Sequence, residues 1–363
     1  MAKKLDSTKA KVVAKKTPVN KKDPSSLVEV RQQIDSLDQQ IQDLITKRAN
    51  WAQMVREAKG DLKAAVEYYR PERESQILRR VLDRNEGPLS NEVLLRLFRE
   101  IMSACLAQQE PLKVGYLGPE GTFSQQALHK HFGHSAQSLP LASIEEVFQE
   151  IEDGHADFGV VPVENSGQGT IQSTLDMFLT SKLKICGEVE LRVHQHLLSR
   201  TGRMEDIERV YSHPQSLAQC KAWLRQHLPH AEKIPVSSNA EAARRARVAD
   251  DCAAIAGETA GYVYGLKVIA GPIEDRQDNT TRFLVIGREF FTPSGHDRTS
   301  LLVYVRDQPG ALYNVLSPFA KHGVSMNRIE SRPAHSGRWQ YVFFIDVSGH
   351  IEDKNVSSAM AEL

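Results

Sequence analysis

Residues 158–176 read FGVVPVENSGQGTIQSTLD, and this stretch decides how the rest of the chain is interpreted. It begins with an apolar run, Phe158 to Val163, that lacks polar alternation and is typical of a strand buried on both faces of a parallel sheet. Residues 164–169 are polar or small, and a helical pattern begins at Thr170. In open α/β sheets, ligands lie beyond the carboxyl ends of strands, against the next helix. The stretch therefore predicts a binding loop, although an ordinary turn between a strand and a helix has a similar composition.

Composition limits the classes of protein to which the chain can belong. Its 363 residues are 40% apolar and 25% charged, with 46 basic and 46 acidic side chains. This is an ordinary globular composition, and the length allows two or three domains. The balanced charge argues against a dedicated nucleic-acid-binding protein. No apolar run approaches the roughly 20 residues that cross a bilayer, so no membrane partner is expected.

The cysteines and the first residues indicate the compartment. Residues 1–25 are rich in Lys and have no apolar segment of a secretory signal, so they predict a disordered basic tail. Contact of this tail with nucleic acid is the less favoured alternative. Scattered cysteines without CxxC spacing predict reduced, mostly buried thiols in a cytoplasmic protein. They are Cys105, Cys186, Cys220 and Cys252.

Residues 26–110 have the pattern of an all-helical domain. Apolar residues recur on a heptad from Leu27 to Val55, and nothing interrupts the helix before Gly60. The pattern predicts a helix of about 30 residues, or roughly 45 Å. Two shorter helical patterns follow, one beginning at Pro71 and one capped by Ser90. Because these cannot cover the long helix, a second copy of the chain is expected along its apolar seam.

Charged residues interrupt the apolar pattern of this domain. Arg48 lies in the seam and needs a carboxylate, which an ion pair with a neighbouring helix or an anionic ligand would supply equally well. Lys59 follows three helical turns later on the same face. Several cations, one Glu and one Gln thus converge on a small helical core, which describes a pocket for a small dianion with a hydroxyl group.

This pattern resembles the all-helical class of chorismate mutase over roughly residues 26–109. The resemblance implies an intertwined dimer in which Arg31 of one subunit joins residues of the other subunit around chorismate. The implied catalytic residues are Arg48, Lys59 and Gln109, and the implied substrate-binding residues are Arg31, Arg73 and Glu74. Fixed cations would hold the two carboxylates and stabilise the ether oxygen as its bond breaks. Arg70 and Cys105 depart from the residues that some members of the family carry.

Residues 111–292 alternate short apolar strands with helices, which predicts a largely parallel sheet. Three helices begin with a Ser or Thr cap followed three residues later by Glu or Gln, at Thr122, Ser143 and Ser238. Two groups of such units predict two lobes across a cleft, the second lobe covering about residues 192–265. Polar turns are expected to face the cleft, where helix amino ends and Arg282 could hold anions. These turns are Thr122–Ser124, Asn165–Thr170, Gln215–Ser216 and Thr280–Arg282.

The motifs GYLGPEGTFS, VVPVENSGQGTI, YSHPQ and NTTRFLV, in this order, resemble prephenate dehydratase. The resemblance implies a fold similar to two-lobed periplasmic binding proteins. It also implies a reaction that expels carbon dioxide and the ring hydroxyl from prephenate, with Thr281 as the catalytic residue. A Thr hydroxyl is a weak acid, so we expect it to donate a hydrogen bond to the leaving oxygen within a network. The substrate-binding residues carried over are Thr122, Ser124, Asn165, Ser166, Gly169, Thr170, Gln215 and Arg282.

Two other patterns have some features of a binding site. His129, His131 and His134 could suggest a metal, but they lack a carboxylate or Cys companion, so a solvated helix end is expected instead. The GQGT sequence is too short for a phosphate loop and lacks its Lys. No metal or other cofactor is therefore expected.

Residues 298–363 read as strand, helix, two strands and helix, the start of a ferredoxin-like unit. Two of its motifs resemble the ACT domain attached to prephenate dehydratases, which implies a phenylalanine site between paired domains and end-product inhibition. The implied regulatory residues are Gly310, Ala311, Leu312, Glu330, Ser331, Arg332 and Pro333. The sequence stops at Leu363 before the last strand of that unit, so a truncated ACT domain is expected.

The three resemblances predict a multidomain enzyme that converts chorismate to phenylpyruvate for phenylalanine biosynthesis and is inhibited by phenylalanine. The expected fold combines an all-α domain, a two-lobed α/β domain and an α+β ferredoxin-like domain in a cytoplasmic homodimer or higher oligomer. The alternative is a two-lobed small-anion-binding protein with an amino-acid sensor domain and no turnover.

Overall fold

The computed structural model describes residues 26–363 except 60–68, 109, 307 and 334–339. The chain divides into two compact units, residues 1–51 and 52–363, which are described separately. The predictions for the basic tail concern residues 1–25, which lie outside the described residues.

The first unit is formed by α1 (Leu27–Lys59), a continuous helix of 33 residues that extends into the second unit. The predicted long helix is confirmed, because no Gly or Pro interrupts the sequence between these ends. Its heptad side chains are exposed in the single chain, with Leu37 at 54% and Leu44 at 64%.

The second unit begins with a helical part. Pro71 begins α2 (Pro71–Asp83), where its missing N–H costs no helical hydrogen bond. Ser90 caps α3 (Asn91–Ala107) by accepting from the N–H of Val93. Both predicted helix starts are therefore confirmed.

The first lobe of the α/β part is a six-stranded mixed sheet with the main order β2-β1-β3-β11-β5. β1 pairs in parallel with β2 and β3, whereas β11 is antiparallel to β3 and β5 because the chain re-enters this sheet from the second lobe. Strands β1, β2, β3 and β5 therefore run in one direction and β11 runs against them, so the predicted parallel arrangement holds for most of the main strand order. β3 is buried along almost its whole length, as its apolar run indicates. The strands are β1 (Lys113–Leu117), β2 (Gln137–Leu141), β3 (Phe158–Asn165), β4 (Gly169–Thr170), β5 (Lys184–Arg192) and β11 (Thr280–Gly287), and the helices are α4 (Phe123–Phe132), α5 (Ile144–Glu152) and α6 (Gln172–Phe178).

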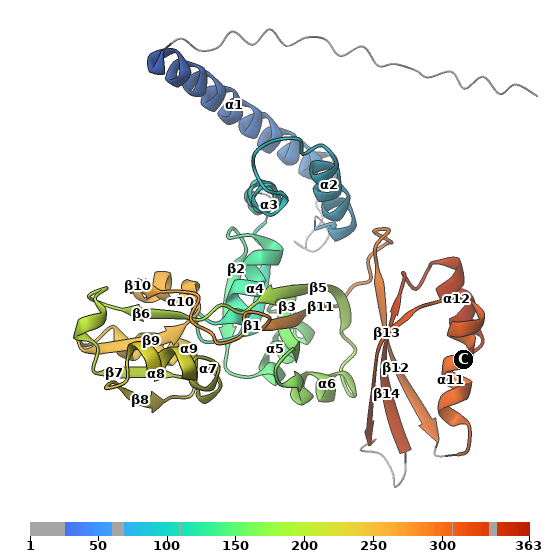
Figure 1. The fold of residues 1–363 in the computed structure, drawn as a ribbon. Helices are drawn as coiled ribbons and strands as arrows, with labels where there is room; N and C mark the ends of the chain where they lie inside the picture. Colours follow the sequence, from blue (N-terminus) through green and yellow to red (C-terminus); the bar gives the residue numbers. More distant parts are fainter. Residues whose placement is uncertain (1–25, 60–68, 109, 307, 334–339) are drawn as a thin grey trace, which may run out of the picture. The chain divides into compact units, whose positions relative to one another are not determined.

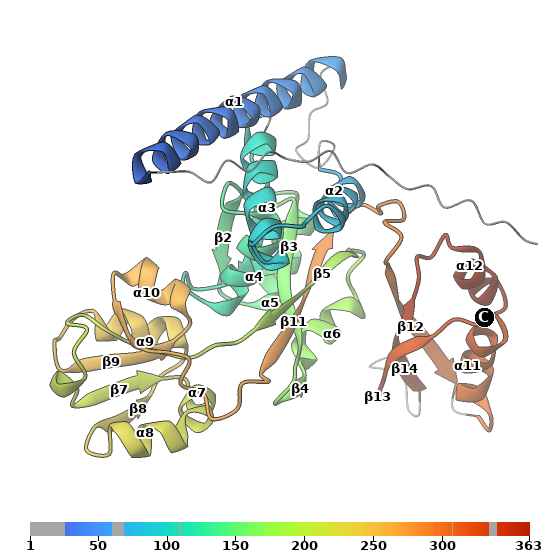
Figure 2. The same ribbon diagram turned by 45° about the horizontal axis from the view of Figure 1, so that its top comes forward.

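The second lobe is a five-stranded sheet with the order β10-β6-β9-β7-β8 and helices around it (Figure 2). Its core is rich in alanine, which lets α9 approach the sheet closely. The strands are β6 (His196–Ser199), β7 (Arg209–Ser212), β8 (Glu232–Pro235), β9 (Cys252–Ala256) and β10 (Lys267–Ala270). The helices are η2 (Met204–Asp206), α7 (Pro214–Gln219), α8 (Lys221–His227), α9 (Asn239–Ala246) and α10 (Glu258–Tyr264).

Helix starts in both lobes follow the capping pattern of the sequence. The side chains of Thr122, Ser143 and Ser238 accept hydrogen bonds from the backbone N–H groups three residues later. The predicted starts of α4, α5 and α9 are therefore confirmed.

Two connecting segments, residues 193–195 and 271–279, join the lobes and are tied to each other. The backbone N–H of Ile273 donates to the carbonyl of Gln195 at 2.9 Å. The carboxylate of Glu274, which is 7% exposed, accepts from the N–H of Gln195 at 2.9 Å and from the ring of His194 at 2.8 Å. One buried acidic side chain thus holds both segments.

The last part is a three-stranded antiparallel sheet with the order β12-β14-β13, and α11 and α12 cover one of its faces (Figure 1). Gly310 caps α11 with φ at +81°, a left-handed conformation that suits glycine. The elements confirm the predicted ferredoxin-like start: β12 (Arg298–Arg306), α11 (Ala311–Lys321), β13 (Met326–Pro333), β14 (Gln340–Ser348) and α12 (Lys354–Ala361).

Candidate functional site

Asn165 and Thr281 form the centre of the candidate site in the α/β part. Asn165 ends β3 and Thr281 is the second residue of β11, and the two are direct partners in the antiparallel register of these strands. The side-chain amide of Asn165 donates to the hydroxyl of Thr281 at 2.8 Å. Both residues are buried, at 7% and 8% exposure. The structure therefore brings together two predicted site residues that lie 116 positions apart.

The orientation of the Asn165 amide follows from its other contacts. Its oxygen accepts from the backbone N–H groups of Gly167 at 3.0 Å and Gln168 at 3.2 Å, so its nitrogen must face Thr281 and Asn279. The Thr281 oxygen is consequently an acceptor in this bond, and its own proton is left to donate to another group. A hydroxyl oriented in this way can assist an oxygen leaving group.

Ser166 fixes the turn that carries Asn165. Its backbone N–H donates to the carbonyl of Thr280 at 2.9 Å, and its hydroxyl accepts from the N–H of Thr280 at 3.0 Å. The role observed for Ser166 is thus to join the turn after β3 to the start of β11. Gly169, at the end of the same turn, has φ at +77°.

The predicted residues near α4 have structural contacts. The hydroxyl of Thr122 donates to the carbonyl of Leu117 at 3.1 Å while it caps the helix. Ser124 is 6% exposed. The contacts of Thr122 explain the start of α4. Contact of Thr122 and Ser124 with substrate stays a prediction.

Gln215 lies in the second lobe at the start of α7, where it is partly buried and its N–H donates to the ring of His213. Its neighbour Ser216 accepts from the side-chain amides of Gln195 at 3.1 Å and Asn239 at 2.9 Å. Gln195 and Asn239 were missed from the sequence. No motif marks them, because only the topology of the second lobe brings their segments together.

Contrary to the expectation from the sequence, the side chains of Thr281 and Arg282 do not both face the cleft. Successive residues of a strand point to opposite faces, so the Arg282 side chain lies on the other side of the sheet. There it pairs with Glu188 at 2.8 Å and with Asp346 of β14 at 2.7 Å, and it is 11% exposed. Thr170 shows a similar departure, because its hydroxyl donates to Glu330 and accepts from Arg328.

The helical site is described only in part. Arg73 is exposed on α2, and Glu74 lies 3.8 Å from Arg99. Arg31 and Arg48 belong to α1 in the first unit, whereas the side chain of Lys59 and all of Gln109 lie outside the described residues. Their convergence around a ligand therefore stays a prediction.

The motifs predicted to be regulatory lie at the start of α11 and on β13. Leu312 is 38% exposed, and Gly310 caps the helix. Arg332 donates to the carboxylate of Asp176 and to the carbonyl of Gln172. The motif Glu330–Pro333 thus contacts the first α/β lobe through two of its side chains.

The histidines near the end of α4 differ from the solvated helix end that was expected. His131 is hydrogen-bonded to the hydroxyl of Tyr69 at 3.1 Å, and burial lowers the pKa of its ring to about 3. His129 and His134 stack with ring centroids 4.4 Å apart. Within the described residues no group of three or more His, Cys, Asp or Glu side chains is arranged to hold a metal ion.

The four cysteines are free and three are buried, as predicted. Cys186, the partly exposed one, has its pKa raised to about 12 by burial, so its thiol is protonated. No helix in the described residues is both long and apolar enough to cross a membrane.

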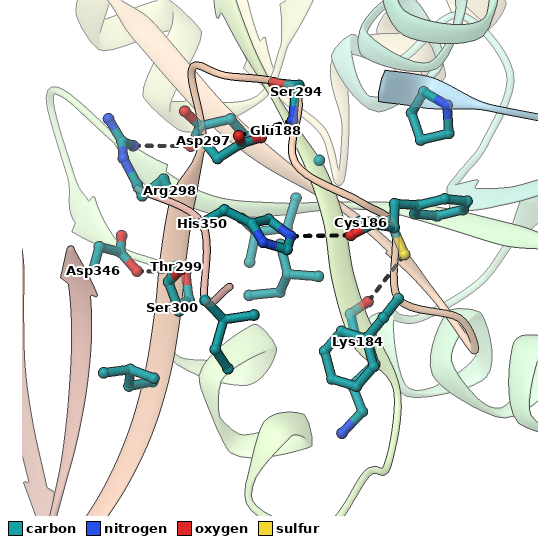
Figure 3. Close-up of a pocket in the computed structure, with 18 of the residues that line it drawn as sticks. Lys184, Cys186, Glu188, Ser294, Asp297, Arg298, Thr299, Ser300, Asp346 and His350 are labelled. Atoms are coloured by element: carbon teal, nitrogen blue, oxygen red, sulfur yellow. Dashed lines mark hydrogen bonds and ion pairs between the residues drawn. The ribbon is translucent and has the colours of Figure 1, made fainter. Parts of the chain in front are cut away.

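A cavity of about 1010 Å³ lies behind the sheet that carries Asn165 and Thr281 (Figure 3). It is lined by β5, by the segment before β12 and by strands of the last domain, and it includes Arg282 but neither Asn165 nor Thr281. Figure 3 shows Asp346 beside Ser300 and Glu188 beside Arg298 in its wall. The cavity thus adjoins the far side of the candidate site.

Comparison with known proteins matches three families along the chain. Residues 30–110 match Chorismate mutase type II, residues 114–290 match Prephenate dehydratase, and residues 299–363 match the ACT domain. Proteins named bifunctional chorismate mutase/prephenate dehydratase are similar over nearly the whole length. That of Stutzerimonas stutzeri is 52% identical, covering 92% of this chain and 93% of the relative. That of Pseudomonas aeruginosa is 50% identical, covering 94% of both.

A solved structure shares the fold of the α/β and ACT parts. It is a prephenate dehydratase from Arthrobacter aurescens in complex with L-Phe, with a TM-score of 0.64 and 36% identity. The likeness covers 69% of this chain and 85% of that chain.

Proposed function

The chain belongs to the family of bifunctional chorismate mutase/prephenate dehydratases, and on this premise we propose how its residues divide the two reactions. The enzyme rearranges chorismate to prephenate in one domain and converts prephenate to phenylpyruvate in the next. The alternative of a binding protein without turnover is not favoured, because the relatives that match the whole chain are enzymes.

The hydrogen bond from Asn165 to Thr281 supports the assignment of the dehydratase centre. In the reaction, the bond between the ring and its carboxylate breaks, and the electron pair enters the ring. The ring hydroxyl leaves as the ring becomes aromatic. Negative charge therefore develops on the departing oxygen. The Thr281 hydroxyl, with its acceptor side turned to Asn165, donates to this oxygen and stabilises the transition state.

Substitution of Thr281 tests this role. Thr281→Val keeps the shape of the side chain but removes the donor, so dehydratase turnover should fall by a factor of about 10² or more. Thr281→Ser, the matched control, should restore much of it. Mutase activity, measured in the same preparation, should be unchanged in both. Turnover of Thr281→Val within a few-fold of the unsubstituted enzyme would move the role to another residue.

For the mutase we propose that Arg31 of one subunit acts with residues of its partner. Arg48, Lys59 and Gln109 would stabilise the breaking ether bond, and Arg73 and Glu74 would hold the substrate. The exposed apolar seam of α1 supports a second copy of this chain as the partner, since a lone helix of 33 residues leaves this face in water.

Subunit mixing distinguishes a shared site from one within a single chain. Arg31→Ala and Arg48→Ala should each abolish mutase activity but leave dehydratase activity intact. In a dimer formed by one chain of each kind, one of the two sites regains all its residues. Refolding the two variants together should therefore restore about a quarter of the unsubstituted mutase activity. If the mixture stays inactive although it contains mixed dimers of one Arg31→Ala chain and one Arg48→Ala chain, Arg31 does not act across the interface.

The ACT domain is proposed to bind phenylalanine and to inhibit the dehydratase. A relative of known structure, 36% identical, is in complex with L-Phe. The motifs Gly310–Leu312 and Glu330–Pro333 are the proposed contacts. Calorimetry with phenylalanine measures this binding on the chain itself, and the absence of a binding signal would remove the regulatory proposal while leaving both catalytic ones.

A further inference from the structure

The strands that hold Asn165 and Thr281 carry charged side chains on their other face. In the register of β3 with β11, Thr281 is opposite Asn165 and Arg282 is opposite Glu164. Because side chains alternate along a strand, Glu164 and Arg282 lie behind the hydrogen-bonded pair. Groups that fix these two side chains also fix the backbone that carries the pair.

The ACT domain holds Arg282 through Asp346. The guanidinium lies 2.7 Å from one oxygen of Asp346, while the other oxygen accepts from the hydroxyl of Ser300 at 2.6 Å. Asp346 is 6% exposed, and the Arg282 side chain is 11% exposed. Glu188 completes the group at 2.8 Å from Arg282. Without the charge of Asp346, Arg282 would keep only Glu188, which it shares with Arg298 at 2.9 Å.

A second contact joins the ACT domain to the turn after Asn165. Thr170 of β4 is opposite Glu164 of β3, and its hydroxyl donates to Glu330. Arg328 donates to the same hydroxyl at 2.8 Å and lies 3.6 Å from the carboxylate of Glu164. The ACT sheet therefore contacts both strands of the catalytic pair, β11 through Asp346 and β3 with β4 through β13.

We propose that Asp346, through Arg282, transmits phenylalanine binding in the ACT domain to the hydrogen bond between Asn165 and Thr281. This inference rests on the proposed function, in which Thr281 acts in dehydration and the ACT domain binds phenylalanine. A ligand changes a distant site only if it binds two arrangements of the protein unequally. Movement of the ACT sheet would separate Arg282 from Asp346. Because Arg282 is next to Thr281 in β11, such a movement would change the position of the Thr281 hydroxyl.

Asp346→Asn in the full-length enzyme tests the coupling. The amide keeps the shape of the side chain and an oxygen for Ser300 but removes the charge that holds Arg282. Glu362→Gln is the matched control, because it makes the same change in the same domain at a pair with Lys321. For each protein, calorimetry measures phenylalanine affinity, and assays measure dehydratase inhibition and mutase activity.

We expect Asp346→Asn to bind phenylalanine within about threefold of the unsubstituted affinity while inhibition weakens by about tenfold or more. Glu362→Gln should behave as the unsubstituted enzyme. Should Asp346→Asn fail to fold, Ser300→Ala takes its place, because it removes the bond that orients Asp346. Phenylalanine should also inhibit Ser300→Ala more weakly than the unsubstituted enzyme.

Three results would overturn the coupling. Inhibition of Asp346→Asn and Ser300→Ala at the unsubstituted level would show that the signal takes another route, with the proposed function intact. Loss of phenylalanine binding in Asp346→Asn would place Asp346 in the effector site. If phenylalanine does not inhibit the unsubstituted enzyme, the regulatory part of the proposed function fails together with the coupling.

Discussion

His131 and Tyr69 give the molecule a pH dependence at the scale of single residues. Burial lowers the pKa of His131 to about 3, whereas in the unfolded chain histidine has a pKa of about 6.5. Below pH 6.5 the unfolded chain therefore binds a proton that the folded protein excludes. Above pH 6.5 His131 therefore does not reduce the free energy of unfolding. Below pH 6.5 it lowers the free energy of unfolding by up to about 1.4 kcal/mol per pH unit.

We expect urea denaturation to show this loss between pH 7 and pH 5, amounting to about 2 kcal/mol from His131 at most. His131→Gln should make the pH dependence shallower by that amount. An unchanged slope in His131→Gln would mean that this ring binds a proton equally well in the folded and the unfolded protein.

Single residues also show which parts of the candidate site could be predicted from the sequence. Asn165 and Thr281 were predicted as site residues, and the structure brings them together. Arg282 was placed on the wrong side because NTTRF was interpreted as a turn, whereas β11 begins at Thr280 and alternates from there. The contact of His131 with Tyr69 joins residues 62 positions apart, a pairing that no local pattern encodes.

At the scale of elements, local signals and long-range pairing differ in how far they can be predicted. Caps and apolar runs depend on neighbouring residues, so the starts of α4, α5 and α9 follow from the sequence. The antiparallel direction of β11 depends on where the chain returns after the second lobe, which a strand pattern does not contain. The contacts of Glu274 are also long-range, because its two partners, His194 and Gln195, come from the other connecting segment.

Glu274→Ala should destabilise the fold through the segments that join the lobes. The substitution leaves the N–H of Gln195 and the ring of His194 without their acceptor, and an unsatisfied buried group costs about 1–3 kcal/mol. The free energy of unfolding should fall by about 2 kcal/mol. Asp278→Ala is the control in the same segment, since its pair with Arg276 is exposed and its loss should have no measurable effect. Equal stability of the two variants would show that Glu274 does not hold the segments.

At the scale of the whole molecule, phenylalanine should affect the two activities unequally. The ACT domain contacts the dehydratase through Arg282, Thr170 and Asp176, on the elements that carry or adjoin the Asn165–Thr281 pair. We therefore expect stronger inhibition of dehydration than of chorismate rearrangement, measured on one preparation with both substrates. Equal inhibition of the two activities would point to a change in the assembly as a whole rather than in the catalytic sheet.

Because coupling between two sites is reciprocal, it can also be measured as the effect of a substrate analogue on phenylalanine binding. If phenylalanine weakens the binding of an unreactive prephenate analogue by a given factor, the analogue must weaken phenylalanine binding by that factor, which for allosteric proteins is about 5- to 150-fold. Calorimetry with each ligand, alone and with the other at saturation, supplies both factors. Factors above one mean that phenylalanine and the prephenate analogue favour different arrangements of the protein. Factors of one, in an enzyme that phenylalanine still inhibits, would show that the effector slows the chemical step without changing how substrate binds.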